Sequence, residues 1–156
     1  MEKSFLDNKL QISFKFVLGI RGNLSGFEND FAEFKKYKTK FIKKGTKISA
    51  SALPCDADFF QYFSRCEYVR DLSLNEQVYN EKETGFRAEL SCFLEDVLDH
   101  KFLIDKMNNG AECTIRIAIQ SDEAQLYFEM FPEHIRLLSE IGLKCEFSVL
   151  SWGMVG

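Results

Sequence analysis

Proline, tryptophan and histidine are scarce in this chain of 156 residues, which contains 2 Pro, 1 Trp and 2 His. A collagen-like chain or a flexible linker would be much richer in proline and in glycine than the 9 Gly found here. A disordered chain would have fewer apolar residues than the 46% of this sequence. These shortages exclude the non-globular classes, and we expect a single folded domain over residues 1–156.

Long apolar runs are also missing. The most apolar stretch near the N-terminus, residues 10–20, is interrupted by Gln11, Ser13 and Lys15, so it has the pattern of a strand and not of a signal peptide. No run approaches the roughly 18 apolar residues that a transmembrane helix needs. We therefore expect a cytoplasmic protein that makes no contact with a membrane.

The cysteine pattern lacks the spacing of a metal site. Neither a C-x-x-C pair nor a Cys/His cluster occurs, and no H-E-x-x-H pattern is present. The odd number and wide spacing of the cysteines predict free thiols in a reducing compartment, with Cys113 and Cys145 inside the core. The five are Cys55, Cys66, Cys92, Cys113 and Cys145. We expect neither a metal nor a cofactor.

Sequence patterns of known catalytic sites are absent as well. The chain has no phosphate-binding loop, no dinucleotide fingerprint and no nucleophile elbow. Asp96 and His100 are spaced to pair on one face of a helix, which is a common surface arrangement. We expect His134 to be exposed in the first turn of another helix. The sequence therefore predicts no catalytic residues and a protein that is not an enzyme.

Phenylalanine is abundant, with 16 Phe against 5 Tyr, and most of these rings should be buried. Apolar alternation predicts strands at about 10–18, 46–53, 113–120, 126–130 and 143–150, with 113–120 and 126–130 forming a hairpin. Periodicity predicts helices at about 27–37 and 85–108. A third begins at Pro132 and ends at Gly142, with Ile135, Leu138 and Ile141 facing inward. Residues 55–80 are ambiguous: Phe59, Phe60, Tyr62 and Phe63 fit the start of a helix capped by Asp56, and residues 67–78 fit a further strand.

This order of elements predicts an α+β fold with a mostly antiparallel sheet and helices packed on one face. Charge is divided along the chain: residues 1–50 have a balance of +6 and residues 51–156 a balance of −10. The basic part contains seven lysines interleaved with Tyr37 and Phe41. They are Lys35, Lys36, Lys38, Lys40, Lys43, Lys44 and Lys47. This run would suit phosphate groups, or it is a solvated helix end and loop.

The acidic part gives the candidate binding residues. Glu89, Asp96 and Asp99 are spaced by seven and three residues on the predicted long helix, so they share a face. A negative surface of this kind would steer and orient a basic partner, or it merely keeps the protein soluble. The predicted partner-binding residues are Glu81, Glu83, Glu89, Glu95, Asp96 and Asp99.

The C-terminal third resembles an uncharacterised family of small bacterial α+β domains. The resemblance lies in the strand at 113–120, in Pro132-Glu133 opening a helix, in Gly142 ending it and in the strand that follows. The Lys43-Lys44-Gly45 turn also fits, whereas the only tryptophan, Trp152, lies away from the middle of the chain where such domains often have one. Proteins of this size also resemble, in general style, the immunity proteins that accompany bacterial toxins. These resemblances supply no catalytic residues.

We therefore expect a cytoplasmic immunity-type protein that binds a cognate toxin and neutralises it by steric and electrostatic occlusion. The expected partner is a basic toxin domain. One alternative is a protein that binds nucleic acid or a phosphate ligand through the Lys35–Lys47 run. A second alternative is a small enzyme whose site is assembled from separated residues.

Overall fold

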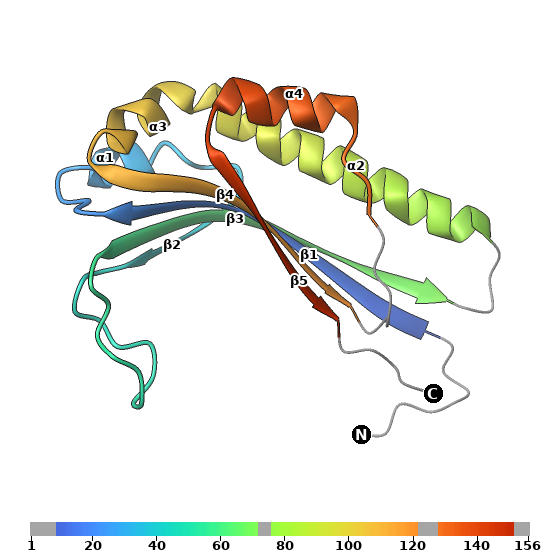
Figure 1. Ribbon diagram of the computed structural model, residues 1–156, viewed down its shortest axis with the longest axis horizontal. Coiled ribbons are helices and arrows are strands. Elements are labelled where there is room, and N and C mark those ends of the chain that lie inside the picture. The colour runs from blue at the N-terminus through green and yellow to red at the C-terminus, as the bar shows by residue number, and fades with distance from the viewer. Residues whose placement is uncertain (1–8, 72–75, 122–127, 152–156) are drawn as a thin grey trace.

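The computed structural model describes residues 9–71, 76–121 and 128–151. Five strands form one sheet in the order β2-β3-β1-β4-β5 (Figure 1). Their bounds are Lys9–Gly22 for β1, Lys38–Ile42 for β2, Asp58–Asp71 for β3, Ala111–Ser121 for β4 and Lys144–Ser151 for β5. β1 lies in the centre and pairs with β3 and β4 in antiparallel register, and β2 extends the sheet beyond β3, also antiparallel. Only β4 and β5 run parallel.

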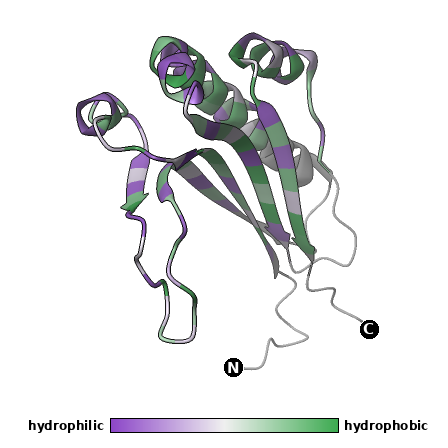
Figure 2. Ribbon diagram, turned by 60° about the vertical axis from the view of Figure 1, so that its left-hand side comes forward, coloured by the Kyte–Doolittle hydropathy of each residue, from purple (hydrophilic) through white to green (hydrophobic). Residues whose placement is uncertain are grey.

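The four helices all lie over the same face of the sheet (Figures 1 and 2). They are α1 at Glu28–Phe31, α2 at Glu76–Asp99, α3 at Lys101–Asn108 and α4 at Pro132–Ile141. α4 connects the parallel strands β4 and β5, because a parallel pair needs a crossover that returns the chain to its starting edge. The prediction of an α+β fold with a mostly antiparallel sheet and helices on one face is confirmed.

The core fills the space between the helices and the sheet. Figure 2 shows alternating hydrophobic and hydrophilic bands along the strands, which is the period-two pattern of a sheet with one covered face. On β1, Phe14, Phe16, Leu18 and Ile20 are buried against α2, whose Phe86, Leu90, Phe93 and Leu94 are buried in return. Cys113 is buried as expected, Cys145 is half-buried, and all five cysteines are free thiols.

The first predicted helix and the second predicted strand differ from the structure. α1 covers only Glu28–Phe31, and a strand follows at Lys38–Ile42 in place of the predicted strand at 46–53. Phe41 on this strand contacts Phe31, with their ring centroids 5.8 Å apart. Residues 46–53 lie in a loop whose base is closed by two hydrogen bonds, Gly45 N–H to the Cys55 carbonyl and Cys55 N–H to the Thr46 carbonyl. Pairing with β3 decides which of the two segments, 38–42 or 46–53, is the strand.

The undecided region 55–80 contains all of β3 and the start of α2. Phe59, Phe60 and Phe63 lie on β3, so the helix considered for them is wrong. The predicted helix at 85–108 is two helices, since α2 starts earlier, at Glu76, and ends just before His100, where α3 begins.

The predicted hairpin is wrong in its described part. β4 pairs with β1 on one side and β5 on the other, and residues 128–130 are not in a strand. Residues 126–127 of the predicted strand lie outside the described residues. α4 begins at Pro132 and has Gly142 at its C-terminus in the left-handed conformation, as predicted. Ile141 is buried and Leu138 half-buried, but Ile135 is 58% exposed and Leu137 is buried instead.

Candidate functional site: the open face of the sheet

None of the described helices covers the second face of the sheet, and we call it the open face (Figure 2). Strand register places its side chains in rows that cross the sheet. One row is Arg65, Lys15, Ala118 and Ser148; the next is Lys38, Phe63, Val17, Arg116 and Glu146; the next is Lys40, Gln61, Gly19, Thr114 and Lys144. The described side chains of the face include seven cations, from Lys15, Arg21, Lys38, Lys40, Arg65, Arg116 and Lys144, and three carboxylates, from Glu67, Glu112 and Glu146. A protein of net charge −4 therefore has one positive face.

Two of the three carboxylates of the open face, Glu112 and Glu146, neutralise the cations near β5. Arg116 donates to Glu146 at 3.0 Å, and Lys144 lies 3.2 Å from Glu112 and 3.1 Å from Glu146. These hydrogen bonds from Arg116 and Lys144 lower the pKa of Glu146. Arg21, at the end of β1, forms an ion pair with Asp56 of the following loop. The β4–β5 half of the face is thus largely balanced in charge.

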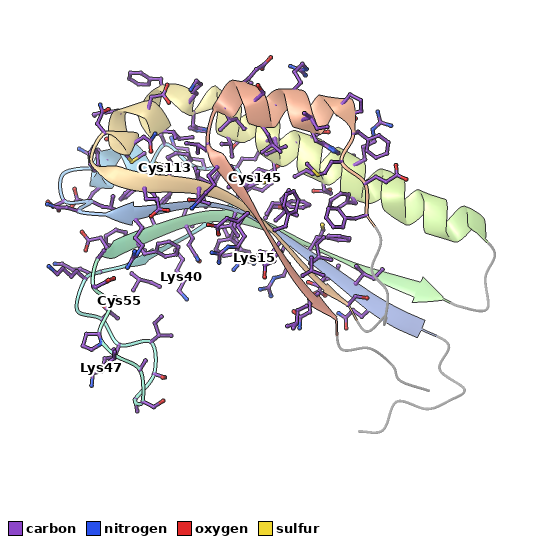
Figure 3. All side chains as sticks on the ribbon, in the orientation of Figure 1. Lys15, Lys40, Lys47, Cys55, Cys113 and Cys145 are labelled. Carbon is purple, nitrogen blue, oxygen red and sulfur yellow. The ribbon has the colours of Figure 1, made fainter. Side chains whose placement is uncertain are left out.

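The β1–β3–β2 half has more cations than anions: its one described carboxylate, Glu67 of β3, accepts a hydrogen bond from Gln11 and forms no ion pair in the described part of the chain. Lys15 and Arg65 are directly opposite each other on adjacent antiparallel strands, where like charges destabilise a sheet. Neither forms an ion pair in the described part of the chain, and the same is true of Lys38 and Lys40. Burial lowers the pKa of Lys15, and repulsion from Arg65, Lys40 and Arg116 lowers it further. Lys15 is therefore the centre of an uncompensated positive region. Figure 3 shows Lys15 and Lys40 on the side of the sheet away from the helices.

Two aromatic rings lie within the same half of the face. The Lys15 ammonium is 4.5 Å from the centroid of the Phe63 ring, a cation–π contact. The Phe59 ring covers Gly19 of β1, since a Cβ placed there would be 3.5 Å from the ring. Glycine within a strand leaves room for such a close approach. Phe59 therefore presents an aromatic surface next to the lysines.

Three hollows lie on the open face, with volumes of about 320, 390 and 520 Å³, and Lys15 lines each of them. The first is polar and includes Ser13, Arg65, Gln120 and Ser148. The third has a wall from the loop between β2 and β3, which projects from the side of the sheet opposite the helices (Figure 1). Asp58 fixes this loop by accepting hydrogen bonds from the backbone N–H groups of Leu24 and Lys44. The loop and the sheet together give a concave surface.

The carboxylates predicted to bind a partner lie elsewhere, on α2. Glu89, Glu95 and Asp99 are exposed and form no ion pair in the described part of the chain. Asp96 is half-buried and accepts a hydrogen bond from the Tyr62 hydroxyl, so it holds α2 on the sheet. Burial raises the pKa of Tyr62, as does this hydrogen bond, which keeps the hydroxyl protonated. Glu81 and Glu83 also belong to α2, but their side chains lie outside the described residues.

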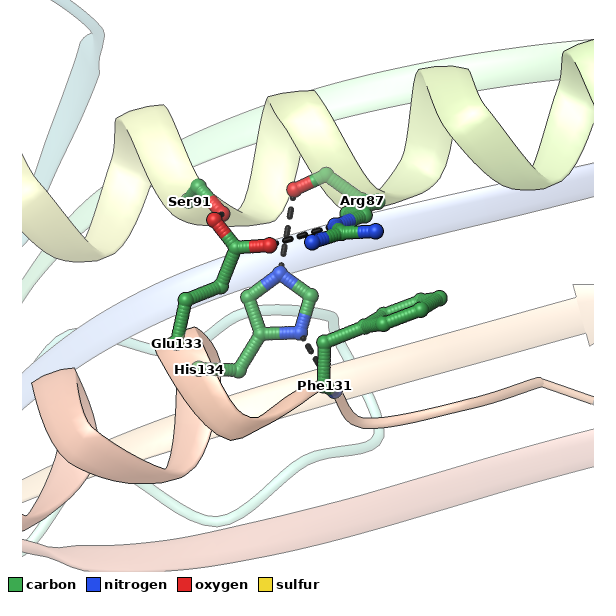
Figure 4. A network of polar contacts seen from close by, with 5 residues as sticks. All are labelled: Arg87, Ser91, Phe131, Glu133 and His134. Carbon is green, nitrogen blue, oxygen red and sulfur yellow. Dashed lines mark hydrogen bonds and ion pairs between the residues drawn. The ribbon is translucent and has the colours of Figure 1, made fainter.

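His134 is fully buried, which corrects the expectation that it is exposed. Its Nδ1 accepts the Phe131 N–H at 3.1 Å, and its Nε2 donates to the Arg87 carbonyl at 3.0 Å (Figure 4). Beside it, Glu133 is paired with Arg87 and accepts a hydrogen bond from Ser91. Because every polar atom of the ring is used between α4 and α2, His134 joins the two helices.

The ring of His100 is also held by contacts within the fold. Its Nδ1 is 2.7 Å from the Asp96 carbonyl and 3.7 Å from the Asp96 carboxylate, so the predicted pair forms but the backbone contact is shorter. Its Nε2 is 3.1 Å from the Glu33 carbonyl, and its ring stacks on Phe34. Each ring nitrogen of His100 faces a carbonyl that belongs to the fold, and the ring joins the α2–α3 junction to the segment after α1.

Comparison with protein-family models, with curated proteins and with solved structures finds no match. Among the described residues, no group of three His, Cys, Asp or Glu side chains could hold a metal ion. None of the described helices combines the length and the apolar composition needed to cross a membrane.

The open face cannot be recognised as a site in the sequence because its cations come from separate segments. Lys40 belongs to the conspicuous lysine run, whereas Lys15, Arg65 and Arg116 are isolated in sequence. One signal was visible, since Lys15 occupies a polar position in the alternating pattern of residues 10–18. Strand register alone brings Arg65 opposite it.

Proposed function

We propose that the protein is an immunity-type binding protein that neutralises a cognate toxin by covering it with the open face of the sheet. The observation that supports this proposal is a concave sheet face whose cations Lys15, Arg65, Lys38 and Lys40 form no ion pair with any described residue and which none of the described helices covers. Arginine and aromatic residues are enriched in protein interfaces, and Arg65, Phe63 and Phe59 lie along the same face of β3.

The charge of this face favours an acidic toxin surface, because complementary potentials speed association and fix orientation. The prediction from the sequence differs, since it expects a basic toxin domain that binds the carboxylates of α2. Both surfaces are open to test. The carboxylates of Glu89, Glu95 and Asp99, which form no ion pair in the described part of the chain, support a basic toxin bound to α2. The charge and the hollows of the open face support an acidic toxin bound there.

The test begins with the product of the neighbouring gene, which the proposal predicts to be the toxin. It is co-expressed with this protein in a growth-rescue assay, and the purified pair is used in a binding titration. A neighbouring product that is not toxic and does not bind would contradict the proposal. Lys15→Glu with Arg65→Glu reverses charge on the open face, and Glu89→Lys with Asp99→Lys reverses it on α2. Lys35→Glu is the matched control, because Lys35 is an exposed lysine outside the sheet.

We expect the open-face variant to lose rescue and to bind at least about tenfold more weakly, a loss of roughly 1.4 kcal/mol. The control should retain both properties. Loss with the α2 variant alone would transfer the binding surface to the helices. Unchanged rescue with both charge-reversal variants would contradict an electrostatic toxin interface.

A second candidate is a protein that binds single-stranded nucleic acid. The supporting observation is Phe59 over Gly19 beside Lys40, since aromatic rings stack on bases while cations follow the phosphates. Binding of a labelled oligonucleotide should then weaken steeply with salt. It should also weaken in Phe59→Ala and in the Lys43→Glu/Lys44→Glu variant. Salt-independent or absent binding would contradict this candidate.

A further inference from the structure

We propose that Lys15 and Arg65 form a binding site for the phosphate group of a small ligand, in the polar hollow of the open face. The inference rests on the open face being the binding surface, as in the proposed function, and does not require that the partner be a toxin.

The cross-strand pair of Lys15 and Arg65 is the first argument. Two cations directly opposite in the middle of a sheet raise the energy of the fold, and neither forms an ion pair in the described part of the chain, with Glu67 of the same face or with any other carboxylate. Lys15 is half-buried, so solvent screens its charge less than that of a fully exposed lysine. A bound anion would remove the repulsion and supply the missing charge.

The lining of the hollow is the second argument. Besides Lys15 and Arg65, the hydroxyls of Ser13 and Ser148 and the amide of Gln120 line the same space, which has a volume of about 320 Å³. Neutral donors of this kind complete the coordination of an anion that has several oxygens. The carboxylate of Glu67 also lines the hollow and accepts a hydrogen bond from Gln11, so the two cations leave the hollow with a net positive charge. The volume is at the lower end of the range for small-molecule sites.

The chemistry of the donors favours phosphate. The guanidinium of Arg65 can donate two parallel hydrogen bonds to one phosphate group, and Lys15 adds a second positive charge. A phosphate monoester carries nearly two negative charges at pH 7, which matches the two cations. Lys40 and Arg116 add to the positive field, because both repel the Lys15 ammonium.

The experiment measures ligand binding to the full chain by calorimetry at low salt. The probes are inorganic phosphate, ribose 5-phosphate as a free monoester, and a single-stranded oligonucleotide whose 5′ end is not phosphorylated. The variants are Lys15→Met and Arg65→Met, with Lys35→Met as the matched control. Because the two cations repel each other, each open-face variant should remain folded, and a thermal melt confirms this.

We expect inorganic phosphate and the monoester to bind the parent protein and the control equally. Each open-face variant should bind both at least about tenfold more weakly, since each loses a hydrogen bond to a charged group. Binding of the oligonucleotide alone would overturn the small-ligand site and support the nucleic-acid candidate. Phosphate binding that is unchanged in both folded variants would also overturn it. Toxin binding is measured separately, so loss of the phosphate site leaves the proposed interface to be judged by its own titration.

Discussion

Substitution of Lys15 by methionine should stabilise the protein while it removes phosphate binding. Methionine keeps the length of the apolar stem and removes the ammonium that faces Arg65. Directly opposite side chains on antiparallel strands have Cβ atoms about 4.5–5.5 Å apart, and a like-charged pair is unfavourable by about 0.2–1 kcal/mol. The lost contact with the Phe63 ring, 4.5 Å from the ammonium, offsets part of this gain.

The expected net gain is about 0.5 kcal/mol in the free energy of unfolding. For a chain of this size, each kcal/mol shifts Tm by roughly 2–4 °C, so Tm should rise by about 1–2 °C. The gain should shrink in 1 M salt, where the Debye length is about 3 Å.

The same pair predicts a pH dependence with a definite sign. Because the pKa of Lys15 is lower in the folded protein than its ordinary 10.5, the charged form is destabilising in the native state. The difference in the free energy of unfolding between Lys15→Met and the parent should have its full value at pH 7. It should disappear as the pH rises through the folded pKa to about 10.5, where the unfolded lysine is neutral as well.

Urea unfolding of the parent, Lys15→Met, Arg65→Met and the double variant would measure these terms in a double-mutant cycle. The cycle should give a repulsive coupling between the two cations. Lys35→Met should leave stability within about 0.5 kcal/mol of the parent. A loss of more than 1 kcal/mol in Lys15→Met, or an attractive coupling, would refute the assignment of an uncompensated cation pair.

Three further substitutions test the framework of the fold by urea unfolding. His134→Ala should destabilise by about 3–5 kcal/mol, because it leaves a cavity and unpaired polar groups between α4 and α2; a loss below 1 kcal/mol would contradict this role. Tyr62→Phe should cost about 1–2 kcal/mol, since Asp96 loses its donor, and an unchanged midpoint would refute it. Gly22→Ala should cost about 1–3 kcal/mol, because φ is +152° and a Cβ would lie 3.0 Å from Ala111 Cα. Gly110→Ala, where a Cβ meets nothing within 4 Å, should be neutral by comparison.

Elements with strong local signals were predictable. The alternation along residues 10–18 gives β1, and its apolar residues face the helices as expected. Pro132 and Gly142 define the ends of α4 because one fixes φ for the first turn and the other adopts a positive φ of 75°. The parts of the long helix on either side of His100 follow from the 3.6-residue period.

Segments with two plausible local patterns were not predictable. Both 38–42 and 46–53 could pair as short strands, and contact of Phe41 with Phe31 and pairing with β3 select the first. The sequence predicts an exposed His134 because it places this residue in the first turn of a helix and does not show which other helix packs against that turn. Its burial depends on the Arg87 carbonyl of α2, which is 47 residues away in sequence.

The sequence by itself determined which residues avoid water along each strand and helix, because the period of apolar residues is a local property. It thereby determined the fold class and the polar character of Lys15. Only the tertiary structure decided that Arg65 stands opposite Lys15 while the carboxylates of the same face pair with other cations. Register between strands depends on all the side chains that pack across the sheet, and a shift of one residue would turn Arg65 to the other face. The candidate site therefore exists only in the folded chain.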